Sequence, residues 1–99
     1  MSTQKVVTYD TFEFQKPVET FTLSSPPVSP VKGHRYIVLS PGDGDWTGHD
    51  NSIATYNGAT WDFMPAREGI LVYVKDEDKF YQYITSWSVA LLTIGDIKS

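Results

Sequence analysis

The loop that begins at Asp43 holds the residues best suited to bind a cation. Asp43, Asp45 and Thr47 place side-chain oxygens at the first, third and fifth positions of a stretch whose sixth residue is Gly48. This spacing matches the first half of an EF-type calcium loop. The position that should supply a bidentate Glu is Ala54, and a β-prone run follows where a helix is required. We therefore interpret the segment as a polar turn of Gly and Asp residues and predict no metal site.

His34 and His49 are the only histidines of the chain, which has no cysteine. A zinc site takes three or four protein ligands at a recognisable spacing, so two isolated histidines do not make one. His49 precedes Asp50, a carboxylate that could orient an imidazole, but the sequence has neither a G-x-S-x-G serine nor a thiol to act as nucleophile. The sequence therefore predicts no nucleophilic catalysis.

Carboxylates gather at Asp76, Glu77 and Asp78, and Asp62 or Glu68 could complete a glycosidase acid–base pair with one of them. Such a pair needs two carboxyl groups about 5 to 10 Å apart in a deep cleft. Acids on a turn are usually solvated, and a domain of 99 residues rarely encloses such a cleft. We predict that the protein is not an enzyme and uses no cofactor.

The tryptophans offer another chemistry, because exposed rings on a β scaffold can stack on sugars while Asp, Asn and His side chains bond the hydroxyls. Trp61 and Trp87 lie in strand-like runs and are predicted to fill the core, whereas Trp46 lies in the polar loop and is expected to contact a ligand. The candidate residues for contact with a glycan or a protein partner are Trp46, His49, Asp45, Asp50 and Tyr56.

Short strands must position these residues. Runs rich in β-branched and aromatic residues alternate with Gly, Pro, Asn, Asp or Ser, and no window has helical periodicity. The pattern predicts an all-β fold, a small antiparallel sandwich or barrel-like domain of about seven short strands with an extended N-terminal arm. The strand-like runs cover residues 11–14, 20–23, 35–39, 53–56, 59–63, 69–75 and 80–84, with a last one at 86–91.

Two of the connections are predicted to be hairpins. Asn57-Gly58 between residues 53–56 and 59–63 favours a type I′ turn, and the acidic tip joins residues 69–75 to 80–84. The run at 69–75 is apolar on both faces, which is typical of a strand covered on two sides, in a sandwich or at a subunit interface.

The chain is expected to form a single domain with one part set apart by prolines. Residues 1–30 are predicted to be an N-terminal arm and Pro-rich linker, and residues 31–99 a compact β domain. The net charge is −4 and the eight Lys and Arg residues are scattered, so nucleic acid is not an expected partner. No run is long enough for membrane insertion and the first residues do not resemble a signal peptide, so synthesis in the cytoplasm is expected.

The order of the motifs resembles one known family. The motifs are Phe12-Glu13-Phe14-Gln15-Lys16-Pro17-Val18, Pro26-Pro27-Val28-Ser29-Pro30, Gly33-His34-Arg35-Tyr36-Ile37-Val38, Gly44-Asp45-Trp46-Thr47-Gly48-His49-Asp50, Ile53-Ala54-Thr55-Tyr56 and Trp61-Asp62-Phe63. This series, from about residue 12 to residue 91, is similar to the DUF2793 family of tailed phages, prophages and gene-transfer-agent-like clusters. The chain departs from the family pattern at Phe14, where the family has Trp, at His34, where it has Asp, and in an extra residue within 65–69.

The resemblance implies a phage virion structural module of a tail fibre, a baseplate or a capsid or tail decoration, which acts by assembly with other virion proteins. It also implies location in the virion and a homo-oligomer, with a trimer favoured by analogy with fibres. The alternative is a carbohydrate-binding module for host-surface polysaccharide, because the spacing from Tyr56 through Gly58 to Trp61 is also similar to that of small chitin-binding modules.

Overall fold

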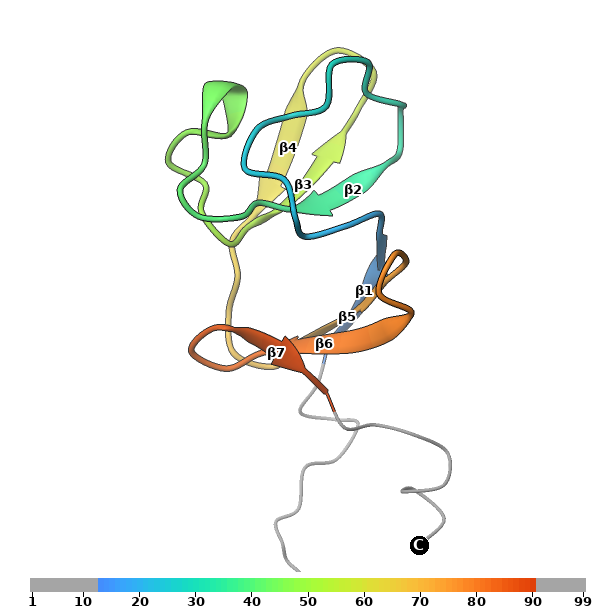
Figure 1. Ribbon diagram of the computed structural model, residues 1–99, viewed down its shortest axis with the longest axis vertical. Helices are drawn as coiled ribbons and strands as arrows, with labels where there is room; N and C mark the ends of the chain where they lie inside the picture. Colours follow the sequence, from blue (N-terminus) through green and yellow to red (C-terminus); the bar gives the residue numbers. More distant parts are fainter. Residues whose placement is uncertain (1–12, 91–99) are drawn as a thin grey trace, which may run out of the picture.

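The computed structural model describes residues 13–90, which form seven strands and one single-turn 3-10 helix (Figure 1). This confirms the prediction of an all-β fold with about seven short strands. Within the described residues, no helix is long and apolar enough to cross a membrane. The elements are β1 (Glu13–Val18), β2 (Arg35–Ile37), η2 (Gly44–Trp46), β3 (Ile53–Tyr56), β4 (Trp61–Met64), β5 (Ile70–Val74), β6 (Lys79–Tyr83) and β7 (Trp87–Val89).

The strands form two sheets, one of four strands in the order β1-β5-β6-β7 and one of three in the order β2-β3-β4. Neighbouring strands are antiparallel except β1 and β5, which run parallel from Glu13 opposite Ile70 to Val18 opposite Val74. The prediction of a purely antiparallel arrangement is therefore wrong for this pair. Parallel neighbours need a long crossover, and here the whole three-stranded sheet lies between β1 and β5 in the chain.

The first two predicted strands differ from the structure. Residues 11 and 12 lie outside the described part, and the observed β1 continues through Pro17, which lies at an irregularity of the ladder on an edge strand. A proline has no N–H to donate, and edge positions tolerate this loss. Residues 20–23 form no strand, but they run beside β2, where the N–H groups of Ile37 and Leu39 donate to the carbonyls of Thr20 and Leu23.

Residues 13–30 are built into the body of the molecule rather than into a separate arm. β1 is a strand of the four-stranded sheet, and Val18 is fully buried in the core. The remainder of the predicted arm, residues 1–12, lies outside the described residues, as does residue 91 of the last predicted strand. The prolines of the predicted linker, Pro26, Pro27 and Pro30, precede β2 in the chain.

Each face of the three-stranded sheet covers a separate core. The first core lies between the two sheets, where Ile37 and Ile53 meet the side chains of β5 and β6. The second lies on the opposite face of the three-stranded sheet, where Tyr36, Ala54 and Trp61 pack under the loop that contains Trp46. The molecule therefore has three layers, in the order loop, three-stranded sheet and four-stranded sheet.

Most of the run at 69–75 is buried on both faces, as its alternation predicts, and only Lys75 at its end is exposed. Ile70, Val72 and Val74 are fully buried in the first core, and Leu71, on the opposite face of β5, is only 1% exposed. The β5–β6 hairpin with its acidic tip also forms as predicted, with Asp78 in the left-handed region at φ 57°.

The β3–β4 hairpin is confirmed, but its turn differs from the predicted type I′. The N–H of Asn57 donates to the carbonyl of Thr60 (2.9 Å), so Gly58 and Ala59 are the central residues. Only Gly58 has a positive φ, of 101°, whereas a type I′ turn needs one at both central positions. The Asn57 side chain explains the shift, because its Oδ1 accepts from the N–H groups of Ala59 and Thr60.

Candidate functional site

Trp46, the first candidate for ligand contact, is fully buried. Its ring packs edge-on against Trp61, with ring centroids 5.3 Å apart at 83°, and lies 5.8 Å from the ring of Tyr36. The expectation that the polar loop exposes this side chain is therefore wrong, because the loop folds back over the sheet and Trp46 fills the second core. Its indole N–H finds no hydrogen-bond acceptor in the described part of the chain.

The carboxylates of the loop bind their own backbone. Asp50 Oδ1 accepts from the N–H of Gly42 (2.7 Å) and Oδ2 from the hydroxyl of Ser40 (2.9 Å). These two bonds favour the charged form, so they lower the pKa of the Asp50 carboxyl. Asp43 accepts from the N–H of Gly44 and caps η2, while Asp45 is exposed. Asp50 thus holds the loop closed rather than presenting a free carboxylate.

The backbone of the loop approaches Trp46 very closely at Gly42. A Cβ atom there would lie 2.3 Å from the carbonyl oxygen of Trp46, which is closer than any real contact. Only glycine fits at this position, so the sequence Pro-Gly-Asp-Gly-Asp-Trp is a packing motif of the loop.

Acidic side chains outside the loop are also engaged locally. Tyr73 donates its hydroxyl to Asp78, and Asn57 donates its amide to Asp62 (3.3 Å). Within residues 13–90, no three or more His, Asp or Glu side chains gather where they could hold a metal ion. Asp43 and Asp45, weighed as calcium ligands, therefore belong to no such group among the described residues.

His49 and Tyr56 pack on neighbouring rings of the same sheet face. His49 stacks face to face on Phe63, with ring centroids 3.6 Å apart, and Tyr56 lies 5.1 Å from Trp61. Trp61 and Phe63 stand two residues apart on β4, so their side chains share one face. The rings of His49, Phe63 and Tyr56 are each half-buried. The structure therefore brings together three of the five predicted residues, Trp46, His49 and Tyr56, mainly for packing.

An apolar hollow of about 240 Å³ lies at the seam between the two sheets. Trp87 donates its indole N–H to the carbonyl of Asn51 (2.9 Å) and so ties β7 to the loop that precedes β3. Leu39 at its rim is 47% exposed. We call this feature the seam hollow, and its lining residues are Phe21, Ile37, Val38, Leu39, Asn51, Ser86 and Trp87. The sequence did not reveal it, because its walls come from segments more than 60 residues apart.

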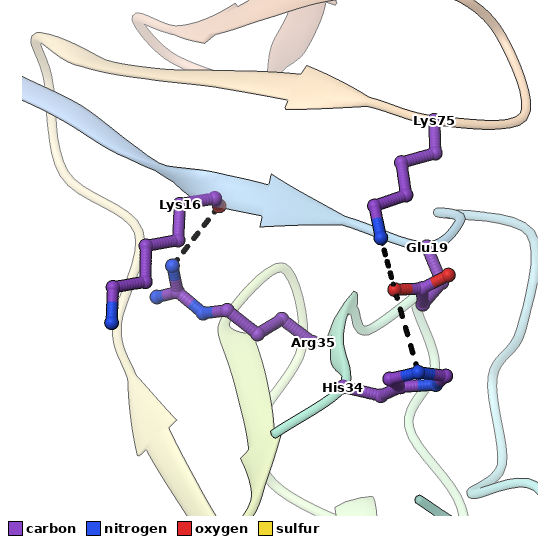
Figure 2. Close-up of polar contacts among 5 residues, drawn as sticks. All are labelled: Lys16, Glu19, His34, Arg35 and Lys75. Carbon is purple, nitrogen blue, oxygen red and sulfur yellow. Dashed lines mark hydrogen bonds and ion pairs between the residues drawn. The ribbon is translucent and has the colours of Figure 1, made fainter.

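A second, polar hollow lies beside β1, at the start of β2 (Figure 2). Lys16 and Arg35 line it, and Glu19 nearby lies between Lys75 and His34. The only signal for this hollow in the sequence is a charged residue, Arg35, directly before the apolar run of β2. A charged residue at this position indicates the start of a strand and does not by itself indicate a binding site.

Comparison with family models places the chain in a known group. The model of the family described as "Protein of unknown function (DUF2793)" matches residues 10–88, so the chain belongs to this family. The match runs from before β1 into β7 and confirms the resemblance inferred from the order of the motifs. No curated protein matches the chain.

Proposed function

We propose that this member of the DUF2793 family is a structural module of a phage particle, placed in a tail fibre, a baseplate or a capsid or tail decoration. It acts by protein–protein assembly and carries out no catalysis. The phage association comes from the resemblance of the motif series to proteins of tailed phages and prophages. The observation that supports assembly is the seam hollow.

The size and lining of the seam hollow suit a protein side chain. Pockets for drug-sized ligands have volumes of roughly 300–1,000 Å³, and the seam hollow, at about 240 Å³, is smaller. Leu39 at the rim is half-exposed and Trp87 is half-buried in the wall, so a partner that covers them removes apolar surface from water. Protein interfaces commonly place an aromatic or aliphatic anchor in a hollow of this kind.

Site-specific cross-linking within purified particles tests this proposal. A photo-reactive amino acid at position 39 should cross-link to a neighbouring protein of the particle, either a second copy of this chain or another virion protein, identified by mass spectrometry. Val28 is fully exposed and lies outside the seam hollow, so the same substitution at position 28 is the matched control. Absence of the protein from particles would refute the proposal, and equal cross-linking from both positions would exclude the seam hollow as the contact.

A carbohydrate-binding function is the second candidate, supported by the half-buried rings of His49, Phe63 and Tyr56 on one face. Such rings can stack on sugar faces, although Trp46 itself is covered. Titration with oligomers of N-acetylglucosamine should then shift the NMR signals of His49 and Tyr56, and Tyr56→Ala should weaken binding. Tyr83→Ala, a half-buried tyrosine of the other sheet, is the control. Equal loss in both variants, or no saturable shift, would count against this function.

A further inference from the structure

The polar hollow is a second candidate site that the proposed function does not use. Its volume is about 360 Å³. It lies where the ladder of β1 becomes irregular, between Gln15 and Val18, and β2 and β3 form the opposite wall. The lining residues are Gln15, Lys16, Gly33, Arg35 and Thr55.

The guanidinium of Arg35 is held in a fixed position in this hollow. Its Nε donates to the hydroxyl of Thr55 (3.1 Å). Its Nη1 donates to the backbone carbonyl of Lys16 (3.0 Å), as Figure 2 shows. A guanidinium carries five N–H donors in a rigid fork, so three donors remain after these two bonds. A fixed fork loses little conformational entropy when it binds a planar or tetrahedral oxyanion.

The positive charge in the hollow has no acidic partner among the described side chains of residues 14–90. Neither Arg35 nor Lys16 forms an ion pair with a described carboxylate, and Glu19 already lies 2.9 Å from Lys75 Nζ and 3.9 Å from His34 Nε2. Arg35 is partly buried, and this burial lowers the pKa of its guanidinium. Removing a cation from water without an anion is unfavourable. This excess of positive charge is local to the hollow, since the whole chain carries a net charge of −4.

We propose that the polar hollow binds a small oxyanion, a carboxylate or a phosphate group, through the fork of Arg35 and the ammonium of Lys16. The anion takes the donors of Arg35 that face the hollow, while Thr55 and the carbonyl of Lys16 keep the fork in place. Lys16 adds charge from the exposed rim. This inference does not depend on the proposed role in a phage particle.

NMR titration of the ¹⁵N-labelled full chain tests the site. Sodium chloride is replaced by sodium phosphate or by sodium acetate at constant ionic strength, and the Arg35 Nε–H and Gly33 N–H signals are followed. We expect these signals to shift and saturate with at least one of the two anions. The anion that binds more tightly shows whether the hollow prefers a phosphate or a carboxylate group, and either preference supports the site.

Lys16→Gln is the informative variant, because Arg35 bonds to the backbone carbonyl of residue 16 and keeps that bond when the side chain changes. Loss of one charge should weaken anion binding about fivefold. Lys79→Gln removes an exposed lysine of β6, away from the hollow, and should leave binding unchanged. Shifts that rise linearly without saturation, or that fall equally in both variants, would overturn the proposal.

Discussion

Trp46 stabilises the fold, and its removal should cost more than that of any other residue of the loop. Trp46→Ala would leave a cavity beside Trp61 and Tyr36, and we expect it to lower the free energy of unfolding by about 3–5 kcal/mol. Urea denaturation followed by the fluorescence of the remaining tryptophans measures this loss. Trp46→Phe is the matched variant, because it keeps most of the ring volume and removes an indole N–H that has no acceptor within residues 13–90. A loss from Trp46→Ala no larger than that from Trp46→Phe would contradict the packing role.

Asp50 makes the loop sensitive to acid. Its carboxyl pKa is lower in the folded protein than its ordinary value of 3.8, first because Gly42 N–H donates to it and then because Ser40 does. The group therefore contributes stability that is fully present above the unfolded pKa and is lost as pH falls through the folded value. We expect the stability difference between wild type and Asp50→Asn to shrink as the pH falls from about 5 through the lowered pKa of the folded protein.

Urea denaturation across this pH range measures the effect of Asp50→Asn. Asp45→Asn changes an exposed carboxylate of the same loop, which accepts no hydrogen bond from the described residues, and is the control. The difference in the free energy of unfolding between Asp45→Asn and wild type should not shrink over the same pH range. A constant difference for Asp50→Asn would show that the two hydrogen bonds do not depend on the charge of the carboxyl.

The loop around Trp46 was predicted from the sequence, but the direction of its tryptophan side chain was not. Gly, Asp and Thr around Trp46 indicate a turn, and the turn exists, but its polar composition also suggested that the tryptophan is exposed. Asp50 and Asp43 accept hydrogen bonds from the backbone N–H groups of Gly42 and Gly44, so the polar side chains bond to the loop itself while its single large apolar side chain turns inward. That inward direction depends on the second core, which forms only when β2, β3 and β4 pair.

Among the elements, the β3–β4 turn depends on the side chain of Asn57. Asn57→Ala removes the acceptor for the N–H groups of Ala59 and Thr60, so we expect a loss of about 1 kcal/mol in the free energy of unfolding. Chemical denaturation measures the loss, and Ala59→Ser, an exposed position of the same turn, is the control. If Asn57→Ala and Ala59→Ser had equal effects, the side-chain acceptor would not determine the turn.

Local pairing explains which elements the sequence could predict. The β3–β4 and β5–β6 hairpins join neighbouring runs, so β-propensity and turn residues were enough to place them. β1 pairs with a strand that lies more than 50 residues away, and its partner is set by tertiary packing that no local pattern records. The segment at 20–23 was predicted as a strand for its β-prone composition, and it does lie along β2, but without a regular ladder.

At the scale of the whole molecule, the three-stranded sheet joins the two cores into one unit. Ile37 and Ile53 face the four-stranded sheet, while their neighbours Tyr36 and Ala54 face the loop. A disturbance of either core therefore reaches the same short strands. Both hollows lie where the sheets meet, and for this reason the sequence, which predicts strands one by one, could not reveal either of them.

The expected homo-oligomer can be tested at the seam hollow. If copies of the chain associate there, Leu39 becomes buried, and a glutamate in its place would bring an unpaired charge into a desolvated contact. We expect light scattering over a range of concentrations to give an oligomer for wild type, with a mass three times that of the monomer favoured, and Leu39→Glu to weaken association about tenfold or more.

Val28→Glu separates a specific contact from a general effect of added charge. Val28 is as apolar as Leu39 and fully exposed, but it does not line the seam hollow, so its replacement should leave the oligomer intact. Circular dichroism of both variants would show that the fold is kept, since Leu39 lies at the rim and not in either core. A wild-type protein that stays monomeric at all concentrations would refute self-association, and equal dissociation of the two variants would place the contact elsewhere.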